Sequence, residues 1–89
     1  MRPVGSVTAF LARHARQPGA DPAAAEILAG LDAEARLAVD AQAQPAHQRA
    51  AWLQERSGEA WSAARLAHVE QRAFVEIRRA LQHRGLWQY

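Results

Sequence analysis

The chain has 89 residues and a formal net charge of +2 at pH 7. This length allows one domain with one modest core, so we expect a single domain over residues 1–89. The absence of cysteine excludes a disulfide framework and a thiolate metal site, and the small excess of positive charge does not by itself indicate a nucleic-acid binder.

The basic residues are of a single kind. All eleven are arginine, and lysine and asparagine are both absent. A GC-rich coding bias in a bacterium or its phage explains this composition, and selection for bidentate binding of phosphate or carboxylate is the alternative. Since no apolar run approaches the ~20 residues that span a bilayer, we expect no membrane contact and a cytoplasmic location.

The first half of the chain divides at its prolines and glycines. Ser6 is a suitable N-cap for a short helix over 7–16, which Pro18–Gly19 then ends. Asp21–Pro22 is a stronger start signal, because Asp caps a helix and Pro fits its first turn. The helix that follows either runs unbroken to about residue 43 or breaks at Gly30, with Asp32 capping a new helix.

The apolar pattern changes phase at Ser57–Gly58. Pro45 opens a segment with a narrow apolar stripe that extends to about Arg56. Continued as one rigid helix, this stripe would point away from the apolar stripe that follows it. We therefore favour a break, with Ser57 capping the last helix. The alternative is a continuous helix that buries different faces in its two halves.

The last third, from Glu59 onward, predicts one long amphipathic helix. Gly85 lies where a C-cap glycine belongs, and Leu86 can fold back on Leu81 in a Schellman motif. Apolar residues recur at helical spacing, namely Leu66, Ala73, Ile77 and Leu81, with Ala63 and Phe74 beside them. Of these, Leu66, Ile77 and Leu81 should be buried with Leu28 and Leu31. The predicted fold is all-α, a compact array of four or five helices with a long C-terminal amphipathic helix.

The first candidate site is a row of arginines at seven-residue spacing on the last helix, opposite its core face. Its members are Arg65, Arg72 and Arg79, with Trp61 one turn before and with His68 and His83 beside the row. Guanidinium groups in a row can bind an acidic protein surface or phosphates. The alternative is a solvated face on which Glu76 pairs with its arginine neighbours.

A second candidate site combines arginine and tryptophan, which is typical of interface hot spots. Arg49 and Arg56 flank Trp52 at spacings of three and four residues. Trp87 and Tyr89 add large side chains at the end of the chain, where a solvated tail would be polar. Burial of Trp52 against another helix is the alternative.

Glu70 interrupts the apolar stripe of the last helix, and Arg84 lies near the same line. A carboxylate at such a position needs a partner. We expect an ion pair with an arginine of another helix. Otherwise Glu70 faces a partner chain and sets the register of the contact. A small core interrupted by a charge also predicts a homodimer at micromolar concentration.

The sequence gives little indication of catalysis. It has no cysteine or lysine nucleophile, its four histidines are dispersed, and it has no glycine-rich phosphate loop. We therefore expect no enzymatic activity, no metal and no cofactor. The predicted function is that of a small protein-binding regulatory, inhibitory or accessory protein acting through its C-terminal helix and aromatic tail. The alternative is a nucleic-acid-binding regulator, as a dimer, that uses the arginine row.

Overall fold

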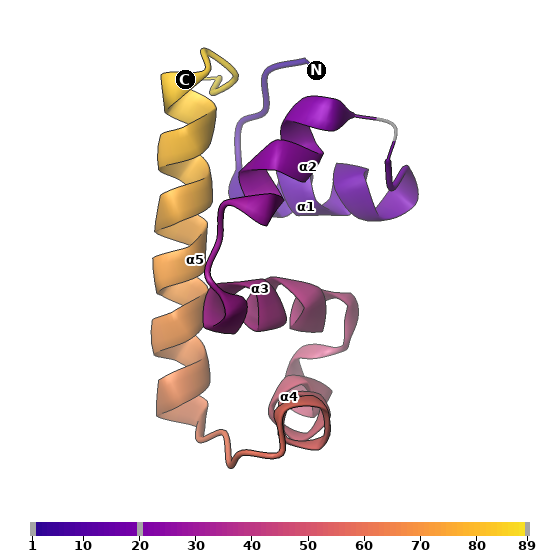
Figure 1. Cartoon of the computed structure of the whole chain (residues 1–89), viewed down its shortest axis with the longest axis vertical. Helices are drawn as coiled ribbons and strands as arrows, with labels where there is room; N and C mark the ends of the chain where they lie inside the picture. The colour runs from indigo at the N-terminus through magenta and orange to yellow at the C-terminus, as the bar shows by residue number, and fades with distance from the viewer. Residues whose placement is uncertain (1, 20, 89) are drawn as a thin grey trace.

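Five α-helices make up most of the described part of the chain, residues 2–19 and 21–88 of a computed structural model (Figure 1). They are α1 (Val7–Arg16), α2 (Pro22–Ala29), α3 (Ala33–Asp40), α4 (Arg49–Ser57) and α5 (Ala63–His83), with 3₁₀ turns η1 (Ala41–Ala43) and η2 (Ala46–Gln48) between α3 and α4. The long α5 runs the length of the molecule, and the shorter helices lie along one side of it (Figure 1). The predicted all-α array with a long C-terminal helix is confirmed.

Four of the described helices begin at a side chain that caps them. The oxygen of the cap accepts a hydrogen bond from a backbone N–H of the first turn, which otherwise has no partner within the helix. The caps are Ser6 for α1, Asp21 for α2, Asp32 for α3 and Ser62 for α5. The segment from Pro22 to Ala43 therefore breaks after Gly30, one of the two alternatives left open by the sequence.

The break between α4 and α5 is confirmed, but Ser57 does not cap the last helix. Gly58 takes a left-handed conformation with φ of 72° and ends α4, whose last residue is Ser57. Residues 59–62 are not helical, and Ser62 caps α5. The long helix thus begins at Ala63 rather than at Glu59.

The interior consists of two clusters along α5, bridged by α3. The first, here called the terminal core, packs Phe10 of α1, Ile27 and Leu28 of α2, and Ala35 and Val39 of α3 against Ala73, Ile77 and Leu81 of α5. The second, here called the Trp61 core, joins Ala38, Ala41, Leu53, Trp61 and Val69. Because α3 contributes to both clusters, it holds the two ends of the array together.

The predicted core face of α5 is confirmed at one end and wrong at the other. Ile77 and Leu81 are buried with Leu28, whereas Leu31 is only partly buried against them. Leu66, however, is half-buried beside the Trp61 core, and Val69 takes the buried position instead. Ala63 is exposed. The buried residues of α5 recur at steps of four, so the position before Ala73 on this face is Val69. Val69 packs with Trp61, and Leu66 lies at the edge of that contact.

Two sets of backbone hydrogen bonds hold residues 86–88 in place. The predicted Schellman motif is present: the N–H of Leu86 bonds the carbonyl of Leu81 at 2.8 Å, and Gly85 has a φ of 71°. The tail then pairs with the first residues of the chain. Val4 N–H bonds Leu86 O at 2.9 Å, and Gln88 N–H bonds Val4 O at 2.8 Å. We call this pairing of Val4 with residues 86–88 the terminal clasp.

Candidate functional site

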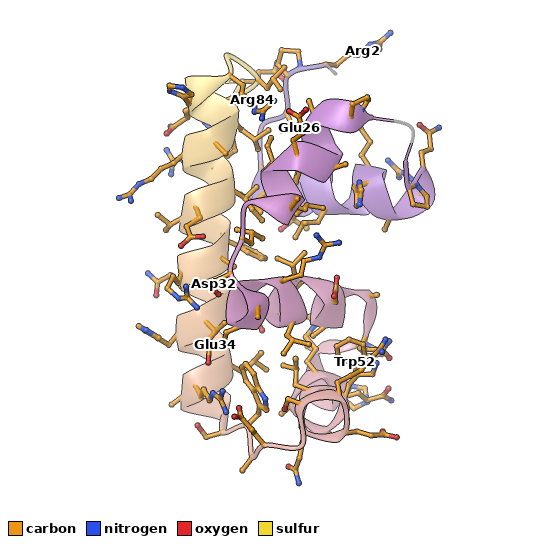
Figure 2. The ribbon with its side chains drawn as sticks, in the orientation of Figure 1. Arg2, Glu26, Asp32, Glu34, Trp52 and Arg84 are labelled. Carbon is orange, nitrogen blue, oxygen red and sulfur yellow. The ribbon has the colours of Figure 1, made fainter. Side chains whose placement is uncertain are left out.

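Two members of the arginine row bind the start of α3. Arg65 donates to Glu34 and to Glu59, each at 2.9 Å. Arg72 donates to both carboxylate oxygens of Asp32 and, at 3.1 Å, to Glu34. Figure 2 shows Asp32 and Glu34 against α5. These ion pairs hold α3 to α5 at the point where the two cores meet.

The ion pairs also shift the ionisation of their members. The hydrogen bond from Arg72 is the largest cause that lowers the pKa of Asp32, and the one from Arg65 likewise lowers the pKa of Glu34. In return, hydrogen bonds to carboxylates raise the pKa of both arginines. For Arg65 the larger effect comes from Glu59 and the smaller from Glu34, and for Arg72 the largest comes from Asp32. Both guanidinium groups are therefore already engaged with carboxylates of their own chain.

The arginine row therefore does not form the open surface that its spacing predicts. Trp61 lies before α5 rather than on it and is only 6% exposed. Its indole N–H bonds Ser57 Oγ at 3.0 Å, and Arg65 Cζ lies 4.0 Å from the centre of its ring. The prediction that the whole row faces away from the core is wrong, because α3 lies against Arg65 and Arg72.

Arg79 is the member of the row that the structure leaves exposed. Within residues 2–19 and 21–88 it has no carboxylate within 4.0 Å, and His68 and His83 are also exposed. Six of the nine carboxylates of the chain pair with only four of its eleven arginines. The remaining arginines are spread over the N-terminal segment, α1, α4 and the second half of α5.

The arginine–tryptophan group of α4 is partly assembled. Trp52 is half-buried beside the Trp61 core, and Arg56 Cζ lies 4.8 Å from the centre of its ring. Figure 2 places Trp52 on the side of the molecule away from α5. Arg49 uses its Nε to bond the carbonyl of Gln44 at 3.0 Å. The structure thus combines the two interpretations of Trp52, since the side chain packs on the core and is only partly buried.

A shallow apolar groove lies where α5, the start of α1 and the C-terminal tail meet. Val75, at 40% exposure, is the large apolar side chain that the described part of the chain leaves at the surface. Beside it are half-buried Phe74 and Trp87, and Arg78 Cζ lies 5.1 Å from the centre of the Trp87 ring. The hollow measures about 560 Å³ and is also lined by Val7, Ala67 and Glu70, among others. We call it the Val75 groove.

Glu70 does not make the ion pair predicted for it. Within the described residues no arginine lies within 4.0 Å of its carboxylate, and the half-buried side chain lines the Val75 groove. The ion pair to another helix is made instead by Arg84, which bonds Glu26 of α2 at 3.0 Å (Figure 2). A role for Glu70 toward a partner chain stays a prediction.

Val75 and Arg78 were not among the binding residues predicted from the sequence. Ala67, Phe74 and Arg78 form a second stripe at helical spacing, and Val75 widens it toward solvent. Two adjacent large apolar residues, Phe74 and Val75, cannot both face the same narrow core stripe of a helix. The adjacent pair Phe74–Val75 was therefore the sequence signal for a second apolar face on this helix.

No protein-family model, no curated protein and no solved structure matches this chain. The described residues contain no cluster of three or more His, Asp or Glu side chains placed to hold a metal ion. None of the helices in that part of the chain has both the length and the apolar character needed to cross a bilayer. Tyr89, a predicted binding residue, lies outside the described residues.

Proposed function

We propose that this chain is a small non-catalytic binding protein that docks a partner protein in the Val75 groove. The observation that carries the proposal is the exposure of Val75 between Phe74 and the Arg78–Trp87 stack. These residues belong to the C-terminal helix and its aromatic tail, where the sequence predicts binding.

The chemistry of the groove resembles the centre of a protein–protein interface. Such centres are apolar and enriched in tryptophan and arginine, with a polar rim that excludes water. Here Phe74, Val75 and Trp87 supply the apolar floor, and Thr8 and Gln71 stand among the residues around it. Docking would remove this surface from water, and the Glu70 carboxylate in the lining would then need a hydrogen-bond donor from the partner.

The partner segment we propose is an amphipathic helix with a carboxylate at one end. The groove lies between the start of α1 and α5, and such a trough suits the apolar face of a helix. Arg78, which lines the groove, and Arg79, the next residue of α5, are both exposed. Neither has a carboxylate within 4.0 Å in the described part of the chain. An acidic residue of the partner would meet them there.

A regulatory, inhibitory or accessory role follows from docking alone. The docked chain would act by covering or positioning a segment of the partner. The nucleic-acid alternative has less support, because Arg65 and Arg72 are already paired with carboxylates of α3. We therefore propose a protein partner.

The test compares Val75→Glu with a charge-matched control on the same helix. Ala64 is exposed, is not among the groove residues and lies in the first turn of α5, so Ala64→Glu should leave the fold and the groove unchanged. The wild-type protein and both variants, checked by circular dichroism, are used as baits in extracts of the native host. A partner retained by the wild type and by Ala64→Glu but lost with Val75→Glu supports the proposal. Equal retention by all three contradicts it.

A further inference from the structure

A second hollow lies on the other side of Phe74, between α1 and α3. It measures about 340 Å³, within the ~300–1,000 Å³ typical of small-ligand sites. Four helices supply its apolar walls: Leu11 comes from α1, Leu28 from α2, Val39 from α3 and Phe74 from α5. We call it the α1–α3 cleft.

One residue in the lining of the cleft carries a buried polar atom without a partner. Nδ1 of His14, which lines the cleft, is shielded from solvent and bonds no group in the described part of the chain. Buried polar atoms in folded proteins almost always have a hydrogen-bond partner. His14 also lines a hollow between α1 and the start of α2, so this atom alone does not assign a ligand to the cleft.

Two arginines reach the same cleft with most of their donors unused. Arg36 bonds Asp40 through Nε at 3.4 Å, and Arg49 bonds Gln44 O through Nε at 3.0 Å. The terminal Nη groups of both arginines bond no described residue. Asp40 also lines the cleft. The two arginines and this carboxylate together give the cleft a net charge of one positive unit. Planar guanidinium groups are well suited to bind a carboxylate with two parallel hydrogen bonds.

We propose that the α1–α3 cleft binds a small organic carboxylate with an apolar body. The carboxylate would lie against Arg36 and Arg49, and the hydrocarbon would pack on Leu28, Val39 and Phe74. The apolar walls favour such an amphipathic anion over inorganic phosphate, which would leave them uncovered. This site is separate from the Val75 groove, although Thr8 and Phe74 contribute to both.

The test titrates the isotope-labelled full chain with octanoate and follows backbone amide shifts by NMR. Octan-1-ol has the same hydrocarbon without the charge, and inorganic phosphate has the charge without the hydrocarbon. We expect saturable shifts at residues of the cleft with octanoate, about tenfold weaker binding of octanol, and no saturable shifts there with phosphate. Absence of saturable octanoate binding, equal affinity for octanol, or preference for phosphate would each overturn the proposal.

Variants then locate the binding. Arg36→Gln combined with Arg49→Gln should weaken octanoate binding about tenfold or more, whereas Arg56→Gln, outside the cleft, should not change it. Ala12 is exposed and lines the cleft, so Ala12→Phe should block binding by filling the hollow without touching the core. Unchanged octanoate affinity in folded Ala12→Phe, or in the folded double variant, would place the ligand elsewhere and refute the assignment.

Discussion

Ser57→Ala should destabilise the protein through the side chain of Trp61. Ser57 Oγ donates to the carbonyl of Leu53 at 2.7 Å and accepts from Trp61 Nε1 at 3.0 Å and from Glu59 N at 3.2 Å. The indole is only 6% exposed, so its N–H has little access to water once the hydroxyl is removed. The substitution thus leaves a largely buried donor without a partner.

The expected loss follows from these contacts. An orphaned buried donor costs about 1–3 kcal/mol, and the more exposed bond to Glu59 adds a fraction of that. We expect a total of about 2 kcal/mol. For a domain of this size, each kcal/mol lowers the melting temperature by roughly 4–8 °C, so the shift should be roughly 8–16 °C.

A double-mutant cycle isolates the contribution of the indole. Trp61→Phe removes the N–H, so in that background Ser57→Ala should cost about 1 kcal/mol less than it does in the wild type. The matched control is Ser62→Ala, which removes the cap of α5, at a cost of about 1 kcal/mol, and should show no such coupling. The measurement is urea unfolding followed by circular dichroism. Equal cost of Ser57→Ala in both backgrounds would refute the reasoning.

The remaining predictions concern the core, the C-cap, pH and self-association. Leu81→Ala should cost about 2–5 kcal/mol in urea unfolding, and Leu66→Ala only about 1 kcal/mol because Leu66 is half-buried. Gly85→Ala should lower stability by about 1 kcal/mol through its φ of 71° alone, since a Cβ there meets no neighbour within 4 Å. The lowered pKa of Glu34 predicts a stabilising contribution that is fully present above the ordinary pKa of 4.5 and is lost as the pH falls through the folded-state value. In Glu34→Gln, melting temperature should therefore depend less on pH below 4.5. Sedimentation equilibrium should show a dimer at micromolar concentration, and a pure 9.8 kDa species would contradict that.

Local signals predicted the helix ends well, because each depends on residues close in sequence. Ser6 and Asp21 cap the helices that they were expected to cap, and the Schellman motif at Gly85 depends only on the last turn and the two residues after it. The start of α5 was harder to predict, because both Ser57 and Ser62 have the chemistry of a cap. The structure resolves that choice by burying Trp61 between them, a contact that no short-range pattern encodes.

The candidate site was predicted less well for the same reason. A spacing of seven shows that Arg65 and Arg72 share one face of a helix, but it does not show what lies opposite that face. Asp32 and Glu34 come from a helix more than thirty positions earlier. Side chains that look like a binding surface within one helix can instead hold two helices together.

The terminal clasp bears on how fast the molecule folds and unfolds. It joins Val4, which is 3% exposed, to a tail at the opposite end of the sequence, so almost the whole chain must be brought into a loop before it can form. Contacts of such high sequence separation tend to form late, after more local helix pairs have docked. An interaction absent from the folding transition state acts on the unfolding rate and leaves the folding rate nearly unchanged. We therefore expect the clasp to govern the lifetime of the folded state. We also expect Trp87 to take its place in the wall of the Val75 groove last.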